Sequence, residues 1–183
     1  MVLIIDASNI RSGGGLTHLK ELLKNGDPCK FEIEKVIVWS SLATLNKLPN
    51  KDWLEKKTHS WLNKSTFFSF LFQMLLISSK ATKDKGYLIF VPGGTFLGSF
   101  NKIVSMSQNM LPFEKEEINR FDSSLIRLKF RFLRLTQKFT FERSKAVIFL
   151  TQYALNNIQN SVNLKNETVI IPHGINLSFL QEP

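Results

Sequence analysis

The sequence predicts an α/β domain with a doubly wound, mostly parallel, Rossmann-like sheet. Short runs of apolar and β-branched residues alternate along the chain with longer stretches of helical periodicity. Several of these runs are apolar without interruption, which is typical of parallel strands that helices cover on both faces. With 183 residues, 43% of them hydrophobic, the chain is long enough for one such domain with a substantial core.

The elements follow in alternating order along the chain. Strands are predicted over residues 2–6, 35–39, 57–62, 87–91, 102–107, 146–151 and 168–171. Helices are predicted over residues 16–24, 66–79, 114–121, 124–143 and 153–159. Pro92 with Gly93 stops the fourth strand, and Pro172 closes the last one. Because α/β sheets bind ligands at the carboxyl ends of their strands, the loops after the strands are where a site is expected.

Composition limits the classes of function. The formal net charge is +9, which favours an anionic partner such as a phosphate-bearing ligand, a nucleic acid or a membrane surface. Cys29 is the only cysteine, so an internal disulfide is excluded and a reducing compartment fits. The apolar start ends at Asp6 without a basic leader, so no signal peptide is expected. The longest apolar stretch, residues 67–77, is too short to span a bilayer.

The loop after the first predicted strand ends in three glycines, Gly13, Gly14 and Gly15. Glycines let a backbone approach a ligand closely, and the start of the next helix offers unpaired N–H groups that suit a phosphate. The loop lacks the Gly-Lys-Ser/Thr of a P-loop and the spacing of the dinucleotide fingerprint, which disfavours a nucleotide- or NAD-binding enzyme. The alternative interpretation is a flexible turn that enters a helix.

A second polar segment follows the strand predicted over residues 102–107. Gln108 and Asn109 stand at the carboxyl end of that strand, where a ligand site is expected. Pro112 ends the extended run, and the acids that begin at Glu114 are typical of the first turn of a helix. Spacing alone favours a strand-to-helix connection with an Asx-type turn here.

The helix predicted over residues 124–143 carries most of the charge surplus. Residues 120–145 hold eight Lys and Arg but two acids, which accounts for six of the nine net charges. Spacings of 4, 3 and 4 place four basic residues on one stripe: Arg127, Arg131, Arg134 and Lys138. A second stripe is predicted to face the core: Leu125, Leu128, Phe132, Leu135 and Phe139. Phe130 and Phe141 are predicted to lie beside the basic stripe, outside the core face.

Basic side chains flanked by aromatic ones suit an anionic bilayer surface. The alternative is the solvated outer face of an ordinary covering helix. Nucleic acid is not an expected partner, because the chain has no recognised nucleic-acid-binding motif.

No catalytic or metal-binding constellation is visible in the sequence. His18, His59 and His173 are not spaced as metal ligands, and Cys29 has no second cysteine to act with. His18 is interpreted as a packing or surface residue, and His173 as part of a turn with Gly174. We therefore expect no metal, and we assign no catalytic residue.

Four stretches are most informative together. They are residues 13–15 between a strand and a helix, residues 93–100 (GGTFLGSF) with 107–114 (SQNMLPFE), residues 141–151 (FERSKAVIFLT) and residues 169–176 (VIIPHGIN). Together they resemble the N-terminal half of family 4 glycosyltransferases of the GT-B fold, most of all the bacterial branch that assembles surface polysaccharides. The resemblance covers nearly the whole chain, and the second stretch is its most specific part.

The resemblance implies transfer of a sugar from a nucleotide-sugar donor to a glycan acceptor, which some relatives bind in lipid-linked form. The transfer would retain the anomeric configuration and need no cofactor. The backbone of Gly13, Gly14 and Gly15 would lie near the donor phosphates. Gly94 and Thr95 would stand at the edge of the acceptor cleft. Asn109 would line it where many relatives have a histidine, and the basic stripe would match the membrane-facing surface of relatives.

The resemblance also implies a division of the chain. Residues 1–176 would form the acceptor-side domain, and residues 177–183 would start the linker to a C-terminal donor domain that this sequence does not contain. We therefore expect the chain alone to transfer sugar poorly or not at all, and a separate C-terminal half is an expected partner. The expected location is cytoplasmic, at the inner face of the plasma membrane. The alternative function is a non-catalytic α/β module that binds membranes or polyanions.

Overall fold

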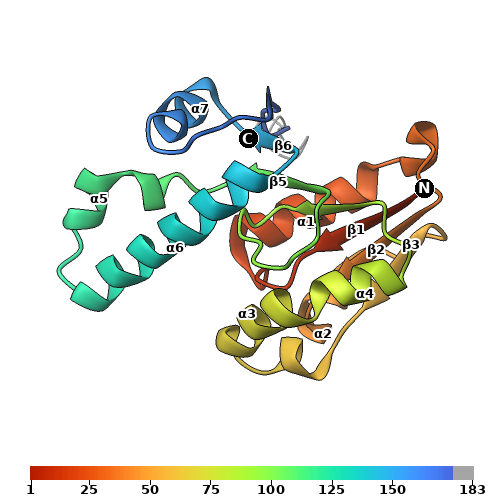
Figure 1. Cartoon of the computed structure of the whole chain (residues 1–183). Helices are drawn as coiled ribbons and strands as arrows, with labels where there is room; N and C mark the ends of the chain where they lie inside the picture. Colours follow the sequence, from red (N-terminus) through yellow and green to blue (C-terminus); the bar gives the residue numbers. More distant parts are fainter. Residues whose placement is uncertain (175–183) are drawn as a thin grey trace, which may run out of the picture.

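The computed structural model describes residues 1–174, and the strands of this part all run parallel in one sheet (Figure 1). The sheet order is β3-β2-β1-β4-β5-β6-β7. The strands are β1 (Val2–Asp6), β2 (Lys35–Trp39), β3 (Leu54–Lys57), β4 (Leu88–Val91), β5 (Ile103–Ser107), β6 (Ala146–Phe149) and β7 (Glu167–Ile170). The predicted doubly wound, Rossmann-like fold is confirmed. The expected start of a linker at 177–183 lies outside the described residues.

Helices cover both faces of the sheet. The helices are α1 (Gly13–Asn25), α2 (Leu42–Leu45), α3 (Thr66–Leu75), α4 (Ile77–Lys83), α5 (Lys115–Asn119), α6 (Ser124–Arg143) and α7 (Gln152–Gln159). Three short 3-10 helices join them: η1 (Pro28–Phe31), η2 (Ser60–Asn63) and η3 (Leu111–Phe113). Within residues 1–174, none of the helices is both long and apolar enough to cross a bilayer.

Successive residues of β1 point into different cores because side chains alternate along a strand. Ile4 packs in one core with Phe72 of α3 and Ile77 of α4. Ile5 packs in the other core with Leu19 of α1. A third cluster joins the end of α6 with β6 and α7. These cores fix α1 on one face of the sheet and the α3–α4 pair on the other.

The chain reverses its direction across the sheet between β1 and β4. From β1 it first builds β2 and β3 on one side, and after α4 it returns to add β4 on the other side of β1. In sheets of this kind the carboxyl ends of the two central strands open into a crevice where ligands bind. The loops after β1, β4 and β5 therefore define the place to examine.

Two predicted elements differ most from the structure. The third strand was predicted over residues 57–62, but β3 ends at Lys57, where the prediction begins, and Ser60–Asn63 is the 3-10 helix η2. The helix predicted over residues 66–79 is two helices, which break at Leu76. The sequence of β3, LEKK, lacks the apolar run that marks the other strands, because β3 is the edge strand of the sheet and its residues are only partly buried.

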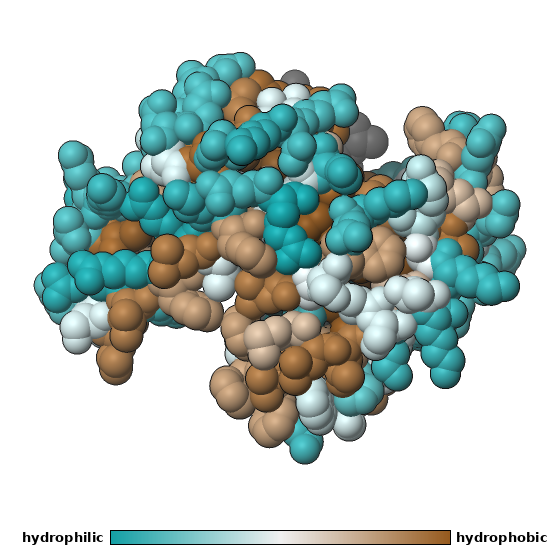
Figure 2. Space-filling model, in the orientation of Figure 1, coloured by the Kyte–Doolittle hydropathy of each residue, from teal (hydrophilic) through white to brown (hydrophobic). Residues whose placement is uncertain are grey.

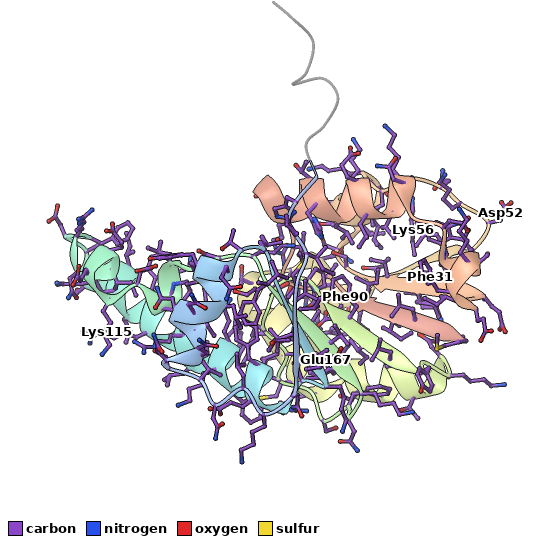
Figure 3. All side chains as sticks on the ribbon, turned by 90° about the horizontal axis from the view of Figure 1, so that it is seen from above. Phe31, Asp52, Lys56, Phe90, Lys115 and Glu167 are labelled. Carbon is purple, nitrogen blue, oxygen red and sulfur yellow. The ribbon has the colours of Figure 1, made fainter. Side chains whose placement is uncertain are left out.

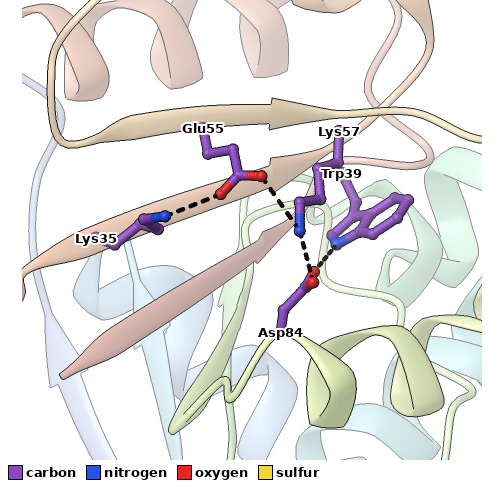
Figure 4. A network of polar contacts seen from close by, with 5 residues as sticks. All are labelled: Lys35, Trp39, Glu55, Lys57 and Asp84. Carbon is purple, nitrogen blue, oxygen red and sulfur yellow. Dashed lines mark hydrogen bonds and ion pairs between the residues drawn. The ribbon is translucent and has the colours of Figure 1, made fainter.

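Charged side chains tie this edge to the end of α4 (Figure 4). Lys57 Nζ lies 3.2 Å from Glu55 and 2.5 Å from Asp84. Trp39 Nε1 donates to Asp84 over 3.2 Å, and Lys35 pairs with Glu55. Burial alone would lower the pKa of Lys57, but the contacts with Asp84 and Glu55 outweigh it and leave this pKa raised. The network joins the polar edge strand β3 to β2 and to the end of α4.

Candidate functional site

Asp6 and Gln73 form a buried hydrogen-bonded pair at the carboxyl end of β1. Gln73 Nε2 donates to Asp6 Oδ2 over 2.6 Å and to the Thr95 carbonyl over 2.7 Å. The Ser8 N–H donates to Asp6 Oδ1 over 3.1 Å. Because a carbonyl oxygen can only accept, the Thr95 contact fixes the orientation of the Gln73 amide. The pair thus joins β1, α3 and the loop after β4 at the reversal point of the sheet.

Complete burial raises the pKa of Asp6, and the hydrogen bonds from Ser8 and Gln73 act in the opposite direction without cancelling it. A buried carboxyl group is costly to ionise unless donors surround it. Asp6 has such donors but lies below the surface, where a ligand cannot reach it. We therefore assign it a supporting role beneath the crevice.

The loop after β1 is held from three directions. Arg11 donates to Ser69 Oγ over 2.7 Å, one helical turn from Gln73 on the same inner face of α3. The hydroxyls of Ser40 and Thr44 donate to carbonyls of the loop, each over 2.8 Å. The Ala7 N–H also donates to the Trp39 carbonyl of β2 over 3.0 Å, so backbone and side-chain bonds together fix the path of the loop. The loop is thus held in a fixed conformation at the carboxyl edge of the sheet.

The three glycines lie in the first turn of α1, which begins at Gly13 rather than at the predicted Leu16. Gly13 has φ +69°, a backbone conformation that side chains disfavour. A Cβ added at Gly13 or Gly14 would have no protein atom within 4 Å, so this backbone faces open space. Ser12, at the N-cap, makes no capping hydrogen bond with its side chain. The first N–H groups of α1 are thus left available to an anion.

Gln108, from the loop after β5, lies directly against this glycine turn. Its Oε1 would be 3.3 Å from a Cβ on Gly15. Asn109 is exposed, and its side-chain oxygen accepts from the Leu111 N–H over 3.0 Å. This bond is an Asx turn that leads into η3. Of the two polar residues after β5, the structure therefore brings Gln108 to the glycines and uses Asn109 to turn the chain.

Gly94 and Thr95 are both buried behind the crevice. Gly94 has φ +70°, and a Cβ there would lie 2.9 Å from the Met106 carbonyl and 3.2 Å from Gln137 Nε2. Thr95 gives its carbonyl to Gln73, while its hydroxyl has no partner among the described residues. The structure places this pair in the packing between the loop after β4 and α6.

Two histidine rings pack against each other between α1 and the segment after β7. The ring centres of His18, on α1, and His173, just after β7, lie 4.7 Å apart. Burial, and then the charge of His173, lower the pKa of His18. The two residues are distant in sequence, so no pattern indicated the pair. Within residues 1–174, no three His, Cys, Asp or Glu side chains gather in a way that could hold a metal ion.

The faces of α6 differ from the prediction. The stripe predicted to face the core is exposed, with between 50% and 76% of each residue accessible to solvent: Leu125, Leu128, Phe132, Leu135 and Phe139. We call these five residues the apolar face. The buried residues of α6 are Thr136, Gln137, Thr140 and Phe141, of which Phe141 was predicted to lie outside the core.

Threonine side chains that form hydrogen bonds explain why a polar face of α6 is buried and its apolar face is exposed. Thr140 Oγ1 donates to the Thr136 carbonyl over 2.8 Å and accepts from the Phe96 N–H over 2.8 Å. A threonine that satisfies its hydroxyl in this way can be buried at little cost. Polarity alone was therefore a poor guide to the inner face of α6.

The apolar face continues onto α3. The rings of Phe132 and Phe70 lie 5.8 Å apart, and Phe67 and Met74 of α3 are exposed beside Phe70 on the same side of that helix. Figure 2 shows the hydrophobic side chains along α6 and over α3, on either side of a notch in the surface. The apolar face and the exposed side chains of α3 thus form one exposed hydrophobic surface.

The basic stripe runs beside the apolar face. Arg131 is exposed, whereas Arg127, Arg134 and Lys138 are partly buried. Arg134 donates to Ser161 Oγ over 3.1 Å, and Lys138 pairs with Glu142. The predicted stripe therefore exists, although two of its four members are partly engaged within the domain.

A scan against protein-family models finds no match to this chain, and a search of curated proteins finds no significant relative. The functional proposal therefore rests on the residues and their geometry.

Proposed function

We propose that the chain is the acceptor-side domain of a retaining glycosyltransferase that takes its sugar from a nucleotide-sugar donor. The observation that carries this proposal is the location of the resembling stretches. The glycine turn follows β1, residues 93–100 and 107–114 follow β4 and β5, and residues 171–174 follow β7. The glycine turn, the Gly94–Thr95 segment, residues 108–114 and residues 171–174 lie at the carboxyl edge of the sheet, which is where a ligand of such a fold binds. Residues 98–100 lie at the opposite edge, where Arg143 donates to the Gly98 and Phe100 carbonyls, and residues 141–151 run from the end of α6 through β6.

The geometry suits a diphosphate at the glycine turn. Gly13 and Gly14 present open backbone, and the start of the 13-residue helix α1 carries a positive dipole end. In glycosyl transfer, negative charge grows on the departing diphosphate, and preorganised donors stabilise it. Gln108 lies against Gly15 with its Oε1 toward the turn and its Nε2 directed at Met106 Sδ, so the donors at this point are the backbone N–H groups.

Gly14→Ala tests this assignment. A methyl group at Gly14 meets no protein atom within 4 Å, and alanine is the better helix former by roughly 0.5–1 kcal/mol. The variant is expected to be as stable as the wild type or slightly more so, yet to bind nucleotide sugars more weakly by calorimetry. Leu22→Ala, exposed and about two turns further along the same helix, is the matched control. Equal affinity of all three proteins for every nucleotide sugar that binds would contradict a diphosphate site at the glycine turn.

Transfer itself is tested with a donor-side partner. We expect the isolated chain to transfer sugar weakly or not at all, and we expect activity to appear when a matching C-terminal half is added. Efficient transfer by the isolated chain would show that the division of roles proposed here is wrong.

A second candidate function, a non-catalytic domain that binds anionic membranes, is favoured by the apolar face beside the basic stripe of α6. Apolar side chains suit the acyl boundary, and each nearby Lys or Arg adds about 1 kcal/mol of attraction to anionic lipid. Binding to anionic vesicles should fall with salt and should persist in Gly14→Ala. It should be lost when Arg127, Arg131 and Arg134 are replaced by Glu. If vesicle binding is unchanged in that triple variant, the basic stripe is not the membrane contact.

A further inference from the structure

A pocket of about 230 Å³ lies between α6 and the η3–α5 segment. Its lining consists of Pro112, Lys115, Ile118, Asn119, Arg131 and Arg134. Figure 1 shows α5 and α6 reaching out beyond the sheet, and Figure 3 shows Lys115 on this arm, far from Phe31 and Asp52 at the opposite end. The pocket begins at Pro112, in the segment that follows β5, but none of its lining residues belongs to the glycine turn.

The pocket has basic side chains at its rim and apolar side chains at its base. Pro112 and Ile118 are buried, whereas Lys115, Asn119 and Arg131 are exposed at the rim. No acid lines the pocket. Of the acids that flank Lys115 in sequence, Glu117 pairs with Arg120 over 2.9 Å, Glu114 accepts from Tyr153 and Asn157, and Glu116 is exposed to solvent.

The cations of this pocket lack carboxylate partners. Among residues 1–174, no ion pair involves Lys115, Arg131 or Arg134. Arg134 is nonetheless held in place, since it donates to Ser161 Oγ and its guanidinium lies 5.9 Å from the centre of the Phe113 ring. A preset guanidinium with free donors is suited to phosphate oxygens, which it can bind in a bidentate manner.

The pocket also adjoins the apolar face. Arg131 precedes Phe132 directly and lies one helical turn from both Leu128 and Leu135. Lipid that contacted the apolar face would therefore present its headgroup at the level of the pocket.

We propose that this pocket binds a phosphate ester, and that the headgroup of an anionic phospholipid is its source. Lys115 and the two arginines bind the phosphate oxygens, and the apolar face lies against the acyl boundary. This inference does not depend on glycosyl transfer, because its binding site and its readout are separate from the glycine turn.

The test compares vesicles that carry a phosphomonoester headgroup with vesicles that carry a diester headgroup. The chain is sedimented with phosphatidylcholine vesicles that contain phosphatidic acid or, at matched surface potential, phosphatidylglycerol. We expect the wild type to prefer phosphatidic acid, because a monoester offers more charge and more free oxygens to the three cations. Lys115→Gln and Arg131→Gln are expected to lose this preference, with binding to phosphatidic acid about tenfold weaker.

Arg127→Gln is the matched control, since it removes one charge from the same stripe outside the pocket. It should weaken binding to both vesicles equally and keep the preference. Titration with glycerol 3-phosphate identifies the source. If glycerol 3-phosphate binds to the wild type and not to Arg131→Gln, the pocket is a phosphate site that a soluble ester can fill. If the wild type binds only the vesicles, the lipid headgroup is the source of the phosphate. A wild type without headgroup preference, or a control that loses it as fully as Arg131→Gln does, would overturn the proposal.

Discussion

The carboxyl edge of the sheet and the outer surface of α6 differ in which side chains they bury and which they expose. At the edge, polar side chains such as Asp6 and Gln73 are buried and bonded to one another. On α6, apolar side chains such as Leu128 and Leu135 are exposed, and cations lie beside them. Buried bonded groups fix a shape in advance of a ligand, whereas an exposed apolar surface lacks the contact that would cover it. One domain thus combines a hydrogen-bonded carboxyl edge with an exposed apolar surface on α6.

The largest effect is expected where the preformed region is broken. Gln73→Leu removes the donor to both Asp6 Oδ2 and the Thr95 carbonyl and leaves two buried acceptors unpaired. We expect a loss of about 3 kcal/mol in the free energy of unfolding, measured by urea denaturation. Gln108→Leu, whose amide makes only a long contact to Met106 sulfur, should lose less than about 0.5 kcal/mol. Equal losses in the two variants would show that the Gln73 bonds do not fix the edge.

The next effect concerns the exposed surface. Leu128→Ser with Leu135→Ser should weaken binding to anionic vesicles by about 2 kcal/mol, because each leucine loses part of its apolar transfer energy. The free energy of unfolding should change by less than about 0.5 kcal/mol, since both side chains are exposed.

Leu22→Ser with Phe31→Ser is the matched control, because these side chains are also exposed but lie on α1 and η1. This pair should leave vesicle affinity unchanged. If the α6 variant instead unfolds the domain, the apolar face is part of the fold, and the contrast between the two regions does not hold.

The smallest effect is a pH dependence at the edge. Because burial raises the pKa of Asp6 above its unfolded value, the folded state holds the proton more strongly than the unfolded state does. The stability that this group contributes is present at low pH and is lost as the pH rises through the folded-state pKa.

Asp6→Asn cannot titrate, so it isolates this contribution. The free energy of unfolding of the wild type, minus that of the variant, should fall as the pH rises above about 4, where the unfolded carboxyl titrates, and through the folded-state pKa of Asp6; urea denaturation at a series of pH values measures it. A difference that grows with pH would mean that the hydrogen bonds from Ser8 and Gln73 stabilise the carboxylate more than burial opposes it.

The sequence predicted the fold well because several strands contain uninterrupted apolar runs, such as Val36–Trp39 in β2, whose two faces are both covered. It misplaced β3 because an edge strand needs no such run. It assigned the apolar face of α6 to the core because periodicity separates the faces of a helix but does not show which one the fold covers. Thr140 is buried because its hydroxyl is hydrogen-bonded to Phe96 and Thr136, so a pattern of apolar residues could not identify it as a core position.

The candidate site was predicted only in part. The glycine turn could be located because glycines after a strand are a local pattern. Gln73 was visible only as an amide that interrupts an apolar helix, and its partner Asp6 lies 67 residues away. The His18–His173 pair and the pocket around Arg131 depend on the order of the strands and the path of α6. Such contacts arise from topology, which residue spacing does not encode.

Amide hydrogen exchange with and without anionic vesicles tests most directly whether the two regions differ as proposed. The account predicts slower exchange in residues 124–139 of α6 and at the start of α3 when vesicles are present, and unchanged exchange in residues 7–15. Protection confined to residues 7–15, or no protection in α6 under conditions in which the chain binds the vesicles, would contradict it.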